Sequence, residues 1–239
     1  MAIMRLDKYL SNQTGMSRSE AREALKSLRV TVNGVTEKHY DYKINTDTDK
    51  VTVNGQPVAY SEYLYILMNK PKGTLTATED KRQRTVLDLL PDELRRKDMA
   101  PVGRLDKDTT GLLLLTDDGK TAHKIISPKS LIEKEYIAML DGDVTEEHVK
   151  AFADGVILSD GTTCMPAVLK IVEQTKASIT ICEGKYHQIK RMFGTVGLGV
   201  NELMRVRIGG LCLPKELPEG EVLIINSREE LIDKISKKV

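Results

Sequence analysis

Acidic side chains stand close to an arginine in the stretch GRLDKDTTGLLLLTDDG, residues 103–119. Asp106 and Asp108 come just before a run of leucines, which fits a metal-binding loop, the turn before a strand, or a catalytic acid. A carboxylate that works away from water needs a cationic partner to stay ionised, because burial favours its neutral form. The sequence offers adjacent Arg104 and, much later, Lys190 and Arg191 for that task.

The alternatives for this stretch differ in how well their residues fit. A calcium loop would use Asp106, Asp108, Thr110, Gly111 and Asp117 at EF-hand spacing. That match is poor, because the last position has Asp in place of the longer Glu and the leucine run predicts a strand where the loop should continue. For Asp108 we favour a turn-capping role, which is common for Asp.

A second charged cluster follows in EGKYHQIKRMFGTVGLGVNELMRVR, residues 183–207. Its first part has helical periodicity that leaves Lys190 and Arg191 off the apolar stripe. In the strand expected next, Arg205 and Arg207 share one face, and the other face is apolar. We therefore expect an exposed basic ridge suited to a phosphate backbone.

The first sixty residues read as a small module with helices near Arg5–Leu10 and Ser17–Leu28. Ser17 and Glu20 form a capping box for the second helix. One side of that helix is apolar and the side beside it is basic. The apolar positions are Ala21, Ala24, Leu25 and Leu28, and the basic ones are Arg18, Arg22, Lys26 and Arg29. The pentamer VTVNG then occurs twice, at 30–34 and 51–55, and each copy predicts a strand running into an Asn-Gly hairpin.

From about residue 60 the pattern alternates between strands and helices. Strands are expected in LYILMNK and near 111–116, 134–140, 168–172, 178–182, 202–208 and 221–225. Helices are expected near 85–90, 120–127, 146–153 and 188–196. The spacing of the later strands predicts an α+β fold, with helices packed on a mixed, largely antiparallel sheet.

The overall composition limits the classes of partner. With 36 basic and 35 acidic residues the chain has no global attraction to nucleic acid, so any such attraction must be local. Cys164, Cys182 and Cys212 are widely spaced and predict free, buried thiols. No apolar leader or membrane span is evident, so we expect a soluble, cytoplasmic protein. We expect a monomer because no stretch of the sequence demands a partner chain.

Several of these segments resemble a known enzyme family. MRLDKYLSNQTGMSRSEAREALKSLRVTVNG is similar to an S4 RNA-binding module. MNKPKG, GRLDKDTTGLLLLTDDG, EKEYIAML and EGKYHQIKRMF resemble the ordered motifs of pseudouridine synthases of the RsuA and RluA type, with the RsuA branch closer. The match covers nearly the whole chain.

The resemblance implies an S4 domain at 1–59 and a catalytic domain at 60–239 with a central cleft between two sheet-bearing halves. Asp106 matches the catalytic aspartate, Tyr136 the tyrosine that stacks on the flipped base, and Lys190 the basic partner of the aspartate. Arg104 would support the flipped nucleotide, and Leu203 would line the pocket. RNA contacts are also expected from Arg5, Arg18, Arg22, Lys26, Arg191, Arg205 and Arg207.

The implied reaction isomerises a uridine in RNA without a cofactor or metal. The implied target is one uridine of 16S ribosomal RNA, of the 516 type, and the partner is either free 16S RNA or a small-subunit assembly intermediate. Two alternatives stay open: a 23S ribosomal RNA pseudouridine synthase, and a non-catalytic S4-type RNA-binding protein in ribosome assembly. The resemblance leaves open whether Asp106 attacks the sugar, attacks the base or removes a sugar proton.

Overall fold

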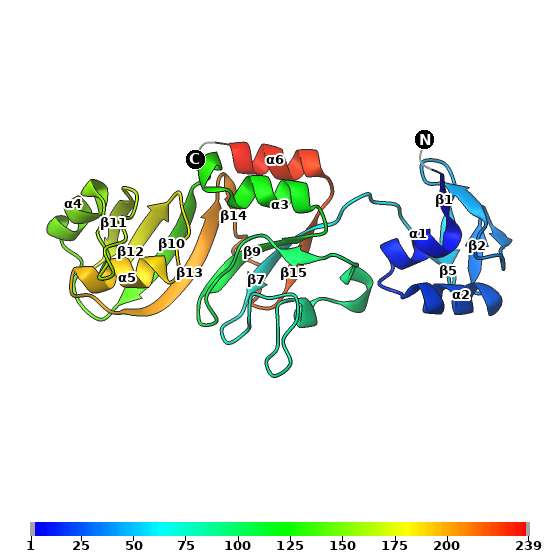
Figure 1. The fold of residues 1–239 in the computed structure, drawn as a ribbon, viewed down its shortest axis with the longest axis horizontal. Coiled ribbons are helices and arrows are strands. Elements are labelled where there is room, and N and C mark those ends of the chain that lie inside the picture. The colour runs from blue at the N-terminus through cyan, green and yellow to red at the C-terminus, as the bar shows by residue number, and fades with distance from the viewer. Residues whose placement is uncertain (1–2, 238–239) are drawn as a thin grey trace. The chain divides into compact units, whose positions relative to one another are not determined.

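The computed structural model describes residues 3–237, which form two compact units (Figure 1). The first unit reaches to Leu64 and also includes residues 89–99, and the second contains Tyr65–Asp88 and the chain from Ala100 onward. Arg96 secures the returning segment within the first unit, because its guanidinium donates to Ser61 O at 3.0 Å and to Gln13 Oε1 at 2.7 Å. The sequence had indicated a boundary near residue 60 but not the return of residues 89–99.

The first unit places two helices against short strands. Its helices are α1 (Leu6–Gln13) and α2 (Arg18–Lys26), with a 3-10 turn, η2, at Asp92–Leu94. A four-stranded sheet has the order β3-β2-β5-β6, with β2 at Val30–Val32, β3 at Val35–Thr36, β5 at Val51–Val53 and β6 at Gln56–Val58. Separately, β1 (Ile3–Arg5) pairs with β4 (Lys43–Asn45). The apolar faces of α1 and α2 meet the valines of β2 and β5 in one buried cluster.

The start of α2 confirms the expected capping box. Ser17 N–H donates to Glu20 Oε2 at 2.7 Å, and Glu20 N–H donates to Ser17 Oγ at 3.2 Å. The expected end at Leu28 is wrong, because the helix ends at Lys26 and Leu28 has a φ of 57°. Arg29 N–H then donates to Ala24 O at 3.0 Å, as expected when a helix is ended by one residue in the left-handed backbone conformation, here Leu28. Leu28 therefore leaves the packed face and is exposed.

Both Asn-Gly hairpins are present. Asn33 and Gly34 have φ angles of 51° and 82°, and Asn54 and Gly55 have 51° and 78°. Positive φ at both central residues is the requirement of a type I′ turn, which Asn-Gly meets with little strain.

The second unit is built on one nine-stranded sheet with the main order β11-β12-β10-β13-β9-β7-β15. The strands of this path are β7 (Tyr65–Lys70), β9 (Thr110–Thr116), β10 (Lys134–Leu140), β11 (Val168–Glu173), β12 (Lys176–Ile181), β13 (Val200–Ile208) and β15 (Val222–Ile225). At its side β8 (Ala100–Pro101) pairs with β9, and β14 (Leu211–Cys212) pairs with β13. All described pairs are antiparallel except β13 with β9, which confirms the mixed sheet. The two expected halves are thus parts of one sheet joined at β9 and β13.

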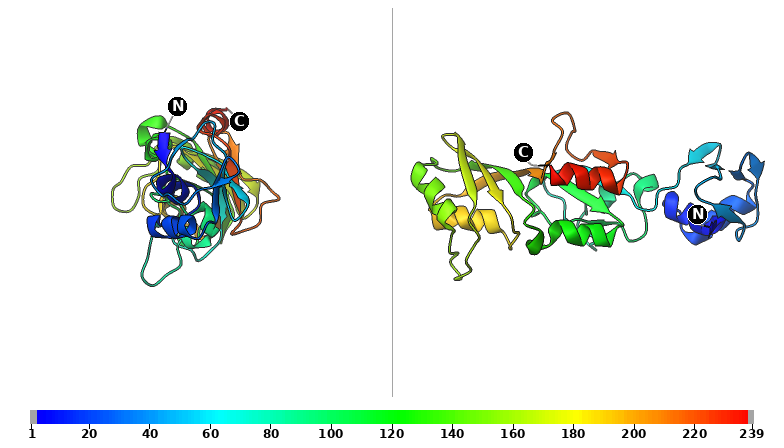
Figure 2. Two further views of the ribbon diagram at one scale, coloured as in Figure 1. Left: turned by 90° about the vertical axis from the view of Figure 1, so that its right-hand side faces the viewer. Right: turned by 90° about the horizontal axis from the view of Figure 1, so that it is seen from above.

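Helices cover this sheet at its two ends (Figures 1 and 2). At one end α4 (Glu146–Asp154) and α5 (Gln188–Thr195) meet through the rings of Phe152 and Phe193, whose centroids are 4.9 Å apart. At the other end α3 (Gly119–Ile126) and α6 (Arg228–Ser236) lie side by side, since Arg228 Nε donates to Thr121 Oγ1 at 2.9 Å. Short 3-10 turns occupy Leu87–Leu89 (η1) and Pro128–Ser130 (η3), so the helix expected at 85–90 is a single turn.

The cysteines are all free, but only Cys164 is buried. Cys182 is intermediate and Cys212 is exposed, so the expectation of three buried thiols is wrong for these two. Among the described residues, no helix combines the length and apolar character that a membrane span requires.

Candidate active site

The strand order alone brings the main site residues together. β13 lies between β10 and β9, so Arg205 is paired with Tyr136 on one side and with Gly111 on the other. Gly111 has a φ of 96°, and a Cβ there would lie 2.2 Å from Arg205 O. Only glycine permits this close approach, and it fixes the loop before β9, which carries Asp106, beside β13.

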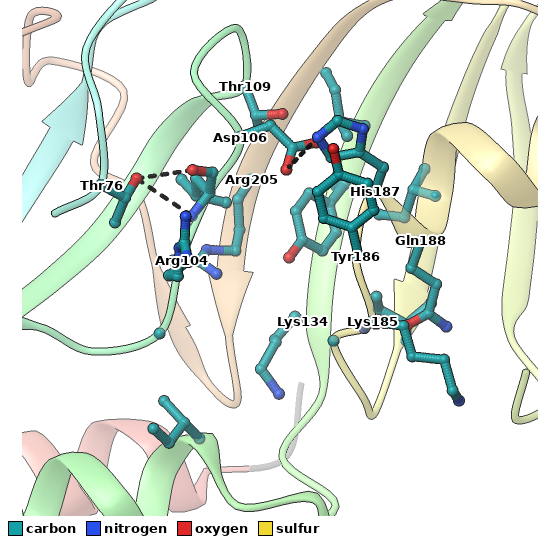
Figure 3. Close-up of a pocket in the computed structure, with 18 of the residues that line it drawn as sticks. Thr76, Arg104, Asp106, Thr109, Lys134, Lys185, Tyr186, His187, Gln188 and Arg205 are labelled. Carbon is teal, nitrogen blue, oxygen red and sulfur yellow. Dashed lines mark hydrogen bonds and ion pairs between the residues drawn. The ribbon is translucent and has the colours of Figure 1, made fainter. Parts of the chain in front are cut away.

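A cleft of about 910 Å³ opens at this junction (Figure 3). Its walls come from the loop before β9, from β10 and β13, and from the start of α5. The polar and charged side chains in its lining include Thr76, Asp80, Arg104, Asp106, Lys107, Thr109, Lys134, Tyr136, Lys185, Tyr186, His187, Gln188, Lys190 and Arg205. Cations outnumber acids in this lining, so the cleft suits an anionic ligand.

The loop that carries Asp106 is fixed by hydrogen bonds on both sides. Thr76 Oγ1 donates to Leu105 O at 2.8 Å and accepts from Leu105 N–H at 3.3 Å. Thr109 N–H closes a turn on Asp106 O at 3.1 Å. The carboxylate therefore stands on an ordered backbone, as a catalytic group requires.

Lys70 donates hydrogen bonds to the backbone of the same loop. Its side chain is fully buried at the end of β7, and Nζ donates to Pro71 O at 3.1 Å, Lys107 O at 3.2 Å and Thr109 O at 2.9 Å. Burial lowers the pKa of Lys70 to about 8, although the negative charges of Asp108 and Asp106 act in the opposite direction. The ammonium group of Lys70 is thus buried against the backbone of the loop that carries Asp106 and Asp108.

Two cationic or ionisable groups from α5 and its N-terminus face Asp106. Lys190 Nζ lies 3.7 Å from Asp106 Oδ2, and His187 Nε2 lies 3.5 Å from Oδ1. The Asp106 side chain is 26% exposed, so it faces the cleft and not bulk solvent. Lys190 therefore joins the loop before β9 to α5.

Lys190 is shared between two carboxylates. It is closer to Asp108, with Nζ at 2.6 and 2.7 Å from the two oxygens, and this bond lowers the pKa of Asp108. Arg191 instead pairs with Asp160 at 2.5 Å and is not part of the cleft lining. Of the two neighbouring residues Lys190 and Arg191, Lys190 is therefore the one within ion-pair distance of Asp106.

The opposite wall of the cleft is aromatic and apolar. Tyr136 and Leu203 are buried, and Arg205 lies with its guanidinium carbon 6.0 Å from the centroid of the Tyr136 ring. Arg205 Nε donates to Leu112 O at 2.7 Å. A planar base could enter between this wall and Asp106.

Comparison with known proteins gives this geometry its context. A family model described as RNA pseudouridylate synthase matches residues 64–195, and an S4 domain model matches residues 4–49. The chain belongs to the RNA pseudouridylate synthase family. It is an isomerase with an appended S4 domain.

Relatives extend this similarity over nearly the whole chain. The chain is 41% identical over 230 residues to YtzG of Bacillus subtilis, named as an uncharacterized RNA pseudouridine synthase, covering 95% of this chain and 96% of that protein. It is 40% identical over 228 residues to ribosomal small subunit pseudouridine synthase A of Escherichia coli K12, covering 95% and 98%. A crystal structure of a pseudouridylate synthase matches with a TM-score of 0.66 and 34% identity, covering 97% of this chain and 99% of that one.

In this pseudouridine synthase, the structure gathers most of the expected catalytic-domain residues in one cleft. The residues that share it are Arg104, Asp106, Tyr136, Lys190, Leu203 and Arg205. Arg191 and Arg207 are outside its lining. The expectation that Arg205 and Arg207 form an exposed ridge is wrong, because these residues are only 3% and 9% exposed.

Pairing explains why Arg207 can be buried, because it forms ion pairs with Glu135 at 2.7 Å and Glu133 at 3.1 Å. Burial of a charged group is tolerated where such partners compensate it. Arg205 is compensated only in part: its Nε donates to the Leu112 carbonyl, while its Nη2 is buried without a hydrogen-bond partner among the described residues. The sequence correctly placed Arg205 and Arg207 on the same face of β13, but that face is buried and not exposed to solvent.

In the S4 unit, the expected basic residues surround one buried acid. Asp7 is fully buried, and Arg5, Arg18 and Arg22 lie 3.0, 3.4 and 3.2 Å from its oxygens. Burial alone would raise the pKa of Asp7, but the bonds from Arg5 and Arg22 outweigh it and the pKa is lowered. Each arginine stays nearly half exposed, so the cluster presents fixed guanidinium groups to solvent. Lys26 is also exposed on α2.

Sequence reasoning assigned no role to Lys70 or His187. Lys70 is the last residue of an apolar strand and precedes a proline, and nothing in that pattern distinguishes a buried lysine from an exposed turn residue. His187 lies in the quoted segment EGKYHQIKRMF, where its position just before a predicted helix was the available signal. Its backbone has a φ of 47°, which turns the chain into α5 beside Asp106.

Proposed function

We propose that this enzyme converts one uridine of small-subunit ribosomal RNA, at a 516-type site, into pseudouridine. The supporting observation is the 40% identity to a ribosomal small subunit pseudouridine synthase along 95% of the chain, through both the S4 domain and the catalytic unit. The cleft around Asp106 supplies the chemistry for this assignment. We expect the enzyme to work as a monomer.

The reaction moves one bond and needs no added atoms. The N1–C1′ bond of the uridine breaks, the uracil turns within the cleft, and a C5–C1′ bond forms. The C5 proton is then lost and N1 gains one, so the product is an isomer of the substrate. A positioned carboxylate, a stabilising cation and a closed pocket are sufficient groups for such a rearrangement.

Asp106 is the reacting carboxylate in this proposal. Lys190 and His187 lie within 3.7 Å of its oxygens, and the ammonium group of Lys190 can balance the charge of the carboxylate during the reaction. Tyr136 forms the opposite wall, where its ring can stack on the uracil and its hydroxyl can assist removal of the C5 proton. Leu203 closes the pocket around the detached base.

The uridine must leave its stack to reach this pocket. Extrusion of a base costs a few kcal/mol, which contacts to the neighbouring backbone can offset. Arg104 is exposed at the cleft and can hold the flipped nucleotide from that side. On the S4 unit, Arg5, Arg18, Arg22 and Lys26 can bind phosphates elsewhere on the RNA.

The assignment is tested by mapping the modified position. The purified enzyme is incubated with ribosomal RNA from a strain that lacks the corresponding modification, and pseudouridine is mapped in both subunit RNAs. A single product in 16S RNA is the expected result. A product only in 23S RNA would reassign the target, and no product in any RNA would leave the chain as an RNA-binding protein.

A further inference from the structure

Tyr186 is a large aromatic side chain left in solvent at the edge of the cleft. The residue is 76% exposed, the highest exposed fraction of any described tyrosine. Its ring nevertheless has a defined position, because it stacks on the His187 ring with a centroid distance of 3.9 Å and an interplanar angle of 16°. His187 in turn faces Asp106, so the stacked pair of rings lies beside the reacting carboxylate (Figure 3).

The segment that carries these rings is held in place from within. The backbone N–H of Lys185 donates to Gln188 Oε1 at 2.9 Å, and Gln188 Nε2 donates to Glu183 Oε1 at 2.7 Å. Arg191 Nη1 donates to Tyr186 O at 3.3 Å. Gln188 is itself buried, at 4% exposed. An aromatic ring held on such a frame is preorganised to bind a flat partner with little loss of side-chain freedom.

The surroundings of the rings favour a nucleobase as that partner. Lys185, Lys190 and Arg104 line the same cleft, so a ligand that carries phosphates is drawn to it. One face of Tyr186 rests on His187, and the exposure of the residue leaves the other face to solvent. Single-stranded RNA binds such rings by stacking its bases on them.

The position of Tyr186 separates it from the uracil pocket. Tyr136 is inside the cleft and only 7% exposed, whereas Tyr186 is 76% exposed and rests on the face of His187. A base on the free face of Tyr186 is therefore separated from His187 by the Tyr186 ring, whereas the uracil that reacts must lie at Asp106. Such a base belongs to a neighbouring nucleotide.

We propose that the free face of Tyr186 stacks on the base of a nucleotide adjacent to the target uridine. The stack of base, Tyr186 and His187 then anchors the RNA strand beside Asp106 while the uridine is extruded. This inference rests on the proposed function, because it assigns a second binding position to the same site. Because purines stack more strongly than pyrimidines, Tyr186 would favour a purine over a pyrimidine at the nucleotide beside the modified uridine.

The test uses RNA oligonucleotides around the uridine that the mapping experiment identifies. One oligonucleotide has the natural sequence, and two others have an abasic nucleotide immediately before or after the uridine. Binding and turnover are measured for the wild-type enzyme, Tyr186→Ala and Tyr186→Phe. The phenylalanine variant keeps the ring without the hydroxyl and is the matched control.

For the natural oligonucleotide, Tyr186→Ala should weaken binding roughly 5- to 150-fold, the range expected for loss of one base–aromatic stack, with a smaller change in kcat. Tyr186→Phe should bind like the wild type. One of the two abasic oligonucleotides should bind the wild type as weakly as the natural RNA binds Tyr186→Ala, and the variant should show no further loss with it.

The proposal is overturned if Tyr186→Ala binds the natural oligonucleotide as tightly as the wild type. It is also overturned if the variant loses the same factor with every oligonucleotide, which would indicate a structural role for the ring. Failure of the proposed function is distinct, because then the wild-type enzyme would form no pseudouridine in the mapping experiment.

Discussion

Lys190 donates to both carboxylate oxygens of Asp108, at 2.6 and 2.7 Å, although these residues are 82 positions apart in the sequence. The same ammonium group lies 3.7 Å from Asp106. In the described structure Asp108 therefore competes with Asp106 for Lys190. Asp108 has a 56% exposed side chain, so solvent screens the pair and it stabilises the fold by at most about 1 kcal/mol.

The two partners of Lys190 should respond differently to substitution. Asp108→Asn removes the charge that competes with Asp106 for Lys190. Because an exposed ion pair contributes less than about 1 kcal/mol, turnover should stay within about threefold of the wild type. Lys190→Met removes the cation beside Asp106 and should lower kcat roughly 10- to 100-fold. This factor corresponds to the free energy of one hydrogen bond to a charged group. Lys150→Met, which removes an exposed lysine of α4 outside the cleft lining, is the control. Equal losses in the Lys190 and Lys150 variants would contradict this assignment.

Lys70 should make stability depend on alkaline pH. The folded chain binds the Lys70 proton with a pKa of about 8, below its ordinary value of 10.5. Between these values the unfolded chain holds a proton that the folded chain has lost, so the free energy of unfolding rises with pH. The free energy of unfolding of the wild type minus that of Lys70→Met should grow from about pH 8 to pH 10.5 in urea titrations. A difference that is flat or falls over this window would show that Lys70 keeps its proton when buried.

The Lys70→Met variant should also be less stable at neutral pH. It leaves the carbonyl oxygen of Thr109 without its buried donor, at a cost of about 1–3 kcal/mol, whereas Lys107 O keeps its bond from Gly73 N–H at 2.8 Å. The measurement is the midpoint of urea unfolding at pH 7. A midpoint equal to that of the wild type would mean that water replaces the ammonium group.

Asp7 should stabilise the S4 unit only while it is ionised. The folded pKa of this carboxyl is lowered, so its contribution is present above the ordinary value of 3.8 and is lost as the pH falls through the folded value. Asp7→Asn should destabilise the full-length protein by about 1–3 kcal/mol at pH 7, because it weakens bonds to the arginines. The difference from the wild type should shrink below pH 3.8, as followed by urea unfolding. Asp41→Asn, an exposed change in the same unit, should stay within about 0.5 kcal/mol, and an equal loss there would contradict the role of Asp7.

The exposed cations of α2 should set part of the salt dependence of RNA binding. Arg18→Gln combined with Lys26→Gln leaves Arg5 and Arg22 on Asp7 and removes two positive charges from the surface. For each phosphate that the variant no longer neutralises, the slope of log K against log salt should become shallower by about 0.7–0.9. Affinities measured at several salt concentrations give the slope. An unchanged slope would mean that this face of α2 is only solvated.

Local sequence signals predicted much of the fold because they are properties of neighbouring residues. The strand at Lys134–Leu140, the capping box of α2 and both Asn-Gly turns follow from periodicity and turn chemistry, and the structure confirms them. Two-residue strands such as β3 and β14 are too short to show a period. The helix α6 was missed although it begins with a capping serine, Ser227.

The candidate site could be predicted only in part, because much of it depends on contacts between distant segments. Family resemblance indicated Asp106, Tyr136 and Lys190, and the fold brings them to one cleft. Periodicity placed Arg205 and Arg207 on one face of a strand but could not show that this face is buried, with Arg207 in ion pairs and Arg205 bonded to a distant carbonyl. The support of Lys70 for the loop likewise spans up to 39 residues.

The most direct test of the account is the Asp106→Asn variant, which keeps the size of the side chain and removes its charge. Pseudouridine formation in ribosomal RNA should fall by at least about 10³-fold, as for loss of an essential nucleophile or base, while RNA affinity and the midpoint of urea unfolding remain at wild-type values. Turnover near the wild-type rate in this variant would contradict the assignment of Asp106 as the reacting carboxylate.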